Sequence, residues 1–140
     1  VLVRGLNLNS PVVIFVHGGP GASDIPFHKV YGQYLEKVFT VIHYDQRGSC
    51  KSGYLNKISS NKLFLETLTI EQHVKDLIAL SEWIHNHHEF NVKQKGLYLI
   101  GGSWGSVIAI LAANKRPDLY KKILLRGLVV NIINSEKIST

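Results

Sequence analysis

The sequence predicts an α/β fold, an open and mainly parallel sheet with helices on both of its faces. Short apolar runs rich in β-branched residues alternate with segments whose apolar residues recur at helical spacing. The apolar runs are continuous, which is typical of strands that are covered on both faces. Strands that alternate with helices in this way favour a parallel sheet joined by right-handed crossovers.

Residues 1–3 are expected to be the end of a strand, and a cluster of turn-forming residues follows at 7–11. Four further strands are expected after this turn. Each expected strand is a short apolar or β-branched run. The runs are 12–16, 39–44, 97–100 and a last one that begins at 123 and extends to about 130.

Three helices are expected between these strands. The first begins at a cap formed by Ser23 or Asp24 and runs to about Lys37, with Val30, Tyr34, Leu35 and Val38 near one face. The second covers about 69–88 behind the N-cap Thr69, and the third follows 101–106 and stops before Pro117. Residues 54–68 have no clean periodicity, so we expect a loop there.

Three glycine-bearing loops, 17–21, 45–53 and 101–106, each follow the carboxyl end of an expected strand. Ligands of open parallel sheets bind at the carboxyl ends of the strands. We therefore expect the three loops to share one rim and to form the functional site.

Ser103 is the predicted nucleophile of that site. It lies in the pattern Gly101-x-Ser103-x-Gly105, between an apolar strand and a helix, which is the spacing of a nucleophile elbow. Larger residues at the two glycine positions would collide with the adjoining strand and helix. The helix that follows directs its N-terminal amides at an oxygen that becomes an anion. The same pattern also occurs in ordinary strand-to-helix turns.

A serine nucleophile needs amide donors for the oxyanion and a base that is held by a carboxylate. The backbone N–H of Trp104 is the first predicted donor. The glycines of 17–21 let a second amide approach the substrate, and we predict Gly19, with Gly18 as its rival. A phosphate loop is disfavoured because neither common phosphate-binding glycine pattern is present at these strand ends.

Other polar residues near the rim receive structural predictions. His17 is expected to organise its loop rather than to act as the base, and Asp45 and Arg47 are expected to anchor theirs. The histidines at 85, 87 and 88 lie at a helix end, where interaction with the helix C-terminus is favoured over a metal site. Cys50 has no neighbour that would mark it as reactive.

Composition excludes several classes of protein. The length of 140 residues predicts one domain, and 45% hydrophobic and 19% charged residues are typical of a globular protein. The net charge of +6 comes from dispersed Lys and Arg without interleaved aromatic residues, so nucleic-acid binding is not expected. No apolar run approaches the roughly 18 residues of a membrane span, so no membrane partner is expected. A single cysteine excludes an internal disulfide and fits a cytoplasmic location. The oligomeric state stays open.

Together, the segments His-Gly-Gly-Pro-Gly at 17–21, Asp-Gln-Arg-Gly-Ser at 45–49 and Gly-Gly-Ser-Trp-Gly-Ser at 101–106 make the chain resemble the proline iminopeptidase family of α/β-hydrolases. The resemblance covers about 11–130. It implies a serine hydrolase that releases an N-terminal proline or similar residue from a peptide through an acyl-enzyme. Ser103 would be the nucleophile, the amides of Gly19 and Trp104 the oxyanion hole, and 45–49 a brace. Such acyl transfer needs no cofactor or metal. The sequence departs at Cys50, where the family usually has glycine.

The catalytic triad does not close within these residues. The family order is serine, acid, histidine, yet all seven histidines precede Ser103, and only Asp118 and Glu136 are acidic residues after it. Asp118 is expected at the far end of the elbow helix, away from the rim. We therefore expect 1–140 to be the N-terminal part of an α/β-hydrolase core domain, without the cap and the C-terminal part, and inactive alone.

Alternatives remain at this point. A related esterase, amidase or lactonase would share the same nucleophile, and a truncated, non-catalytic binding module would explain the missing histidine. An epoxide hydrolase is disfavoured, because that chemistry uses a carboxylate nucleophile where this chain has Ser103.

Overall fold

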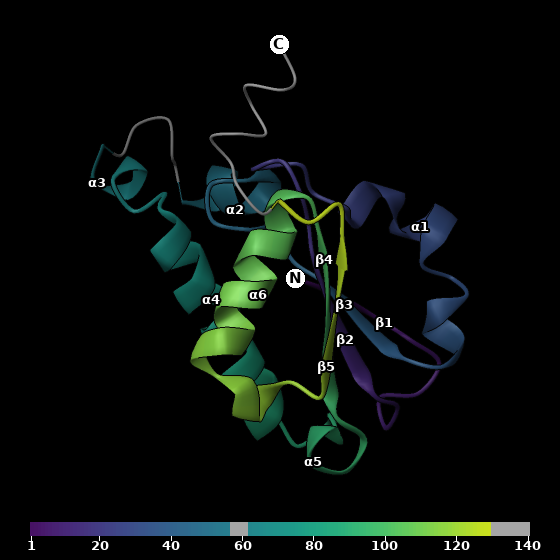
Figure 1. Cartoon of the computed structure of the whole chain (residues 1–140). Coiled ribbons are helices and arrows are strands. Elements are labelled where there is room, and N and C mark those ends of the chain that lie inside the picture. The colour runs from purple at the N-terminus through teal and green to yellow at the C-terminus, as the bar shows by residue number, and fades with distance from the viewer. Residues whose placement is uncertain (57–61, 130–140) are drawn as a thin grey trace.

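A five-stranded sheet forms the centre of the computed structural model, which describes residues 1–56 and 62–129 (Figure 1). Its strands are β1 (Leu2–Arg4), β2 (Val12–Val16), β3 (Thr40–His43), β4 (Leu97–Gly102) and β5 (Lys122–Arg126). The order is β1-β3-β2-β4-β5, and all neighbours pair in parallel except β1 with β3. The predicted open, mainly parallel sheet is confirmed. Within the described residues the last strand ends at Arg126, and position 130 lies outside them.

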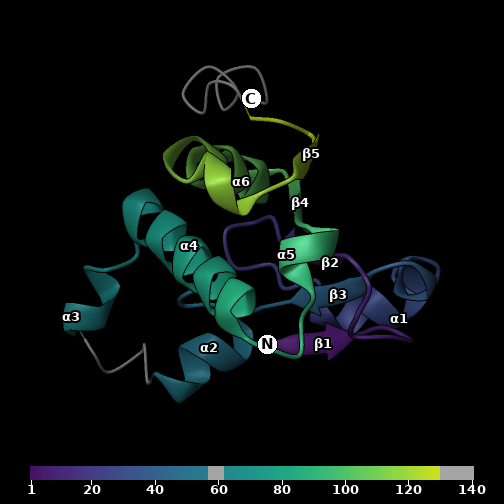
Figure 2. The ribbon, with the colours of Figure 1, turned by 90° about the horizontal axis from the view of Figure 1, so that it is seen from below.

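Two long helices cover one face of the sheet, α4 (Ile70–Asn86) and α6 (Trp104–Lys115) (Figure 2). Their buried residues pack against β2, β3 and β4, and Ile14, Leu77, Leu99 and Ile108 at the centre are at most 1% exposed. The predicted cap of α4 is confirmed, because the Thr69 side chain accepts a hydrogen bond of 3.2 Å from the Gln72 N–H. No helix of the described residues is both long and apolar enough to cross a membrane.

The expected continuous helix from 23 to 37 is wrong. Three short pieces stand in its place: η1 (Ile25–Phe27), α1 (His28–Tyr31) and η2 (Leu35–Lys37). Gly32 ends α1 as its C-cap and begins the turn to η2. Val30, Tyr34 and Val38 are 57–70% exposed, so the apolar face expected there does not pack on the sheet and nothing stabilises a longer helix.

The expected loops at 45–53 and 54–68 also contain helices, α2 (Cys50–Leu55) and α3 (Lys62–Leu65), while 57–61 lie outside the described residues. At Gly53 a Cβ would lie 2.6 Å from the Gly48 carbonyl oxygen, so glycine allows α2 to fold back onto its own loop. The helices are short and mostly exposed, which explains why no hydrophobic period marks them. Two further short helices are α5 (Val92–Lys95) and η4 (Pro117–Leu119).

The other face of the sheet is covered by α1 and η2 over β3 and β2, as seen from below (Figure 2). Towards β5 this face carries an apolar groove of about 320 Å³. Its walls include Val13 of β2, Tyr98 and Ile100 of β4 and Leu124 of β5. The two faces of the described sheet are thus unequally covered.

Candidate active site

Ser103 stands alone between the end of β4 and the start of α6, on an exposed turn. Its backbone has φ 49° and ψ −121°, a conformation that L-residues rarely adopt and that stores strain. Three hydrogen bonds hold the turn. The Ser103 N–H donates to the Arg126 carbonyl at 2.8 Å, and the Ser103 carbonyl accepts from the Ser106 N–H at 2.9 Å and from the Ser106 hydroxyl at 2.5 Å. The backbone is therefore fixed while the serine side chain stays accessible.

The steric prediction for the two pattern glycines is confirmed. A Cβ at Gly101 would lie 2.7 Å from the Gly105 carbonyl oxygen and 3.0 Å from the Ala109 Cβ, inside α6. A Cβ at Gly105 would lie 1.9 Å from the Val16 carbonyl oxygen of the neighbouring strand. Gly102 differs, because a Cβ there would meet nothing within 4 Å. The spacing thus matches two close backbone approaches, one on each side of Ser103.

The loop at 17–21 lies directly against this turn. A Cβ at Gly18 would be 3.3 Å from the Ser103 Cβ. Gly19 has φ 112°, and its peptide bond to Pro20 is cis. A Cβ at Gly19 would come within 2.7 Å of the Gly21 nitrogen, so this position needs glycine. The predicted meeting of 17–21 with 101–106 at one rim is confirmed.

The backbone N–H groups of Gly19 and Trp104 lie at this rim, and neither has a hydrogen-bond partner within the described residues. The Gly18 carbonyl accepts from the His17 ring at 3.0 Å and from the Ala22 N–H at 3.3 Å. In a trans peptide the N–H points opposite to the C=O, so the Gly19 N–H is turned away from the His17 ring. The Trp104 N–H is one of the free donors of the first turn of α6. The roles of these amides stay predictions.

His17 organises its loop, as predicted. Its ring is 1% exposed, and Nε2 accepts a hydrogen bond of 3.1 Å from the Gln46 N–H. The proton assigned from this network is on Nδ1, which donates to the Gly18 carbonyl. Both ring nitrogens are therefore engaged, and His17 is not available as a base for Ser103.

Arg47 anchors the loop at 45–53 to α4, also as predicted. Its guanidinium makes two hydrogen bonds of 2.7 Å to the Asp76 carboxylate, and its Cζ atom lies 5.4 Å from the centre of the Phe64 ring. Asp45 stays within its own loop, where it accepts from the Lys51 N–H at 3.1 Å. The hydrogen bond to Asp76 raises the pKa of Arg47. Burial acts to raise the pKa of Asp76, but hydrogen bonds, first from Arg47, outweigh it and hold that pKa below 3.8.

We expect Asp76→Asn to lower the free energy of unfolding by about 2 kcal/mol at pH 7, because it removes a charged partner of Arg47. The pKa of Asp76 is lower in the folded than in the unfolded state. Its stabilising effect is therefore fully present above the unfolded pKa and disappears as the pH falls through the folded pKa. Urea unfolding of both proteins between pH 7 and pH 3 measures this. A stability difference that does not shrink below about pH 4 would contradict the assignment.

Cys50 begins α2 with φ 38°, in the left-handed region, and its thiol is exposed. This explains why glycine suits the position, since glycine adopts that conformation without a Cβ penalty. We expect Cys50→Gly to raise the free energy of unfolding by about 0.5–1 kcal/mol, whereas Cys50→Ala should leave it near the wild-type value. Urea midpoints of the two variants make the comparison. Equal urea midpoints of the two variants would show that the left-handed backbone at Cys50 does not destabilise the protein.

The histidines at the end of α4 lie apart from the rim. His85 contacts the Leu119 carbonyl at 2.8 Å, and the rings of His87 and His88 stack with centres 5.2 Å apart. Within 1–56 and 62–129 no group of three or more His, Cys, Asp or Glu residues could hold a metal ion. Asp118 is at the far end of α6 from Ser103, as predicted, and pairs there with Arg116 at 2.6 Å.

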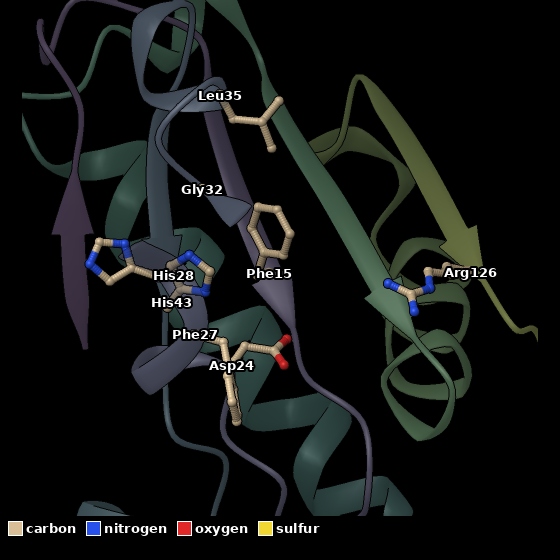
Figure 3. Close-up of a pocket in the computed structure, with 8 residues that line it drawn as sticks. All are labelled: Phe15, Asp24, Phe27, His28, Gly32, Leu35, His43 and Arg126. Carbon is tan, nitrogen blue, oxygen red and sulfur yellow. The ribbon is translucent and has the colours of Figure 1, made fainter. Parts of the chain in front are cut away.

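A small cavity of about 200 Å³ lies on the α1 side of the sheet, near the elbow (Figure 3). Figure 3 shows Arg126 on the β5 side of it, His43 and Asp24 on the other side, and Phe15 between the two sides. Burial raises the pKa of Asp24, and burial together with nearby His28 lowers the pKa of His43 to about 4, so His43 is neutral at pH 7. Sequence reasoning missed Arg126, because only pairing with β4 places it beside Ser103.

Sequence reasoning also missed Gln46, which is 2% exposed and connects two of the three loops. Its side-chain nitrogen donates to the His17 carbonyl at 2.7 Å, and its oxygen accepts from the Trp104 indole at 3.1 Å. The available signal was a neutral, polar residue in the loop that follows a buried strand, because a side-chain amide that becomes buried there needs hydrogen-bond partners.

Comparison with known proteins identifies the family of the fold. The family model described as alpha/beta hydrolase fold matches residues 11–137. The chain is 39% identical over 120 residues to the probable aminopeptidase YbaC of Bacillus subtilis (strain 168), covering 86% of this chain and 35% of that protein. It is 30% identical over 116 residues to the proline iminopeptidase of Neisseria gonorrhoeae, covering 83% and 32%. The chain thus spans about a third of the length of the curated relatives it matches.

Solved structures share the fold. The proline iminopeptidase-related protein from Thermus thermophilus superposes with a TM-score of 0.60 at 23% identity, over 88% of this chain and 39% of that one. An epoxide hydrolase from Vigna radiata gives a TM-score of 0.61 at 18% identity, over 97% and 41%. With the family model over most of its length, the chain belongs to the alpha/beta hydrolase fold family.

Proposed function

We propose that the full-length protein is a serine hydrolase of the proline iminopeptidase type, which releases an N-terminal proline or similar residue from peptides. The observation that carries the proposal is Ser103 itself, an exposed hydroxyl on a strained turn with the unpaired amides of Gly19 and Trp104 at the same rim. A strained and accessible serine at this point of the fold supports a functional role, because backbone strain is concentrated at functional sites.

In the proposed reaction the Ser103 Oγ attacks the carbonyl carbon of the N-terminal residue, and a histidine base takes the hydroxyl proton. The tetrahedral oxyanion accepts hydrogen bonds from the N–H groups of Gly19 and Trp104. The C–N bond then breaks, the histidine gives its proton to the leaving amine, and an acyl-enzyme remains. Water hydrolyses that ester and regenerates Ser103 without a cofactor or a metal.

The base and its carboxylate are proposed to come from polypeptide outside the described residues. Both ring nitrogens of His17 are engaged in hydrogen bonds to neighbouring backbone groups, and Asp118 is at the opposite end of α6 from Ser103. The relatives named as a probable aminopeptidase and a proline iminopeptidase are about three times as long as the region they share with this chain. We therefore expect residues 1–140 alone to show negligible turnover.

The cytoplasmic location expected from the sequence stays a prediction.

The substrate class is tested with the full-length protein and a panel of chromogenic substrates. The panel contains amides with N-terminal proline, alanine and leucine, an N-acetylated proline amide, a short-chain ester and a lactone. We expect the free prolyl amide to give the highest kcat/KM and the acetylated one to be cleaved poorly. A preference for the ester or the lactone would overturn the aminopeptidase assignment but keep the serine hydrolase. Absence of Ser103-dependent cleavage and of fluorophosphonate labelling in a folded protein would favour a non-catalytic binding module.

A further inference from the structure

We propose that Gln46 is a positioning residue that holds the two amides of the oxyanion hole at a fixed separation. The inference rests on the proposed function, because it assigns Gln46 a task in that same site. Gln46 does not touch Ser103 in the described contacts. Its effect passes through His17 on one side and through Trp104 on the other.

On the side of the loop at 17–21, Gln46 makes two hydrogen bonds to His17. The Gln46 N–H donates to the His17 ring at 3.1 Å, and the Gln46 side-chain amide donates to the His17 carbonyl at 2.7 Å. The same ring donates from Nδ1 to the Gly18 carbonyl. Since C=O and N–H of one trans peptide point in opposite directions, fixing the Gly18 carbonyl fixes the direction of the Gly19 N–H.

On the elbow side, Gln46 holds the residue after the nucleophile. The Trp104 indole N–H donates to the Gln46 side-chain oxygen at 3.1 Å. The indole and the His73 ring of α4 also make an edge-to-face contact, with ring centres 6.0 Å apart. The indole is thus fixed at both sides, and the first residue of α6, whose backbone N–H is the other proposed donor, cannot turn freely.

The bridge is buried and uses every polar group of the Gln46 side chain. Gln46 is 2% exposed, so water cannot easily take the place of a lost hydrogen-bond partner, and the loss destabilises the folded protein. Among residues 1–56 and 62–129, no other side chain is hydrogen-bonded to both 17–21 and 101–106. An oxyanion hole works when its donors are already in place, so a residue that sets their separation acts on the transition state rather than on substrate binding.

The test uses the full-length protein with Gln46→Met, which keeps the side-chain volume and removes both side-chain hydrogen bonds. We expect kcat for the prolyl amide to fall about 10- to 100-fold with KM changed less than about twofold, because donors that are misplaced lose transition-state stabilisation. Gln94→Met is the matched control, since Gln94 is exposed on α5 and should keep wild-type kinetics. A normal kcat in folded Gln46→Met, or a loss confined to KM, would overturn the proposal.

Trp104→Phe provides a second test that does not depend on the stability of Gln46→Met. It removes one hydrogen bond of the bridge and leaves the backbone amide of residue 104 in place. We expect a smaller fall in kcat than in Gln46→Met, with no further fall when the two changes are combined, because both break the same link. Additive losses would contradict a shared bridge.

A measurement without substrate completes the design. The indole N–H of Trp104, assigned from its loss in Trp104→Phe, should exchange with solvent at least about tenfold faster in Gln46→Met than in the wild type. Unchanged exchange would contradict the hydrogen bond. If the wild type shows no Ser103-dependent hydrolysis, both the proposed function and this inference fail. If the wild type is active and Gln46→Met is equally active, the inference alone fails.

Discussion

Ser103→Gly is expected to abolish hydrolysis and fluorophosphonate labelling of the full-length protein while making the protein more stable. Loss of the nucleophile should lower kcat/KM by at least about 10⁴-fold, as for other serine hydrolases that depend on a triad. The free energy of unfolding should rise by about 1 kcal/mol, because glycine adopts φ 49° without the Cβ collision that strains Ser103. Activity is measured on the prolyl amide, and stability by urea unfolding.

Ser103→Ala is the matched control for this experiment. It removes the same hydroxyl group and keeps the Cβ, so activity should be lost to the same extent while stability stays near the wild-type value. The comparison separates the chemical role of Ser103 from its strain. Residual Ser103-independent hydrolysis in a purified Ala variant would assign the activity to another residue. A Gly variant that unfolds more easily than the Ala variant would show that the turn is not strained.

The strands and the tight turn at 101–106 could be predicted because their signals are local. A continuous apolar run such as 12–16 identifies a buried parallel strand without knowledge of its neighbours, and β2 has those bounds in the structure. The glycines at 101 and 105 report close backbone approaches, since no other residue would fit there. The rim follows from the same reasoning, because loops after parallel strands meet at one edge of the sheet.

What the sequence did not reveal depends on contacts between distant residues. Gln46 is 29 positions from His17 and 58 positions from Trp104, and no local pattern indicates that one side chain joins the two. The helix expected at 23–37 failed for a related reason. Its apolar residues suggested a packed face, yet Val30 and Tyr34 have no sheet surface to cover, so the segment breaks at Gly32. Helical spacing of apolar residues predicts a buried face, but the face is buried only where another part of the fold packs against it.

Gly105→Ala is expected to have the largest effect on folding of any single methyl group added at the elbow. The new Cβ would lie 1.9 Å from the Val16 carbonyl oxygen and 2.6 Å from the His17 carbonyl oxygen. Both are backbone atoms of β2 and its loop, so no side-chain rotation relieves the contact and α6 must move away from the sheet. We expect the free energy of unfolding to fall by at least about 3 kcal/mol, measured by urea unfolding.

Gly102→Ala is the control three positions before, with the same added methyl group. A Cβ there meets nothing within 4 Å, and the backbone of Gly102 is not in the left-handed region. Its free energy of unfolding should stay within about 0.5 kcal/mol of the wild type. Equal destabilisation by both substitutions would mean that any glycine replaced in this turn lowers stability, independently of the contact between Gly105 and β2. A large effect confined to Gly105→Ala would instead tie the glycine to the approach of α6 to β2, the contact that sets the height of Ser103 above the sheet.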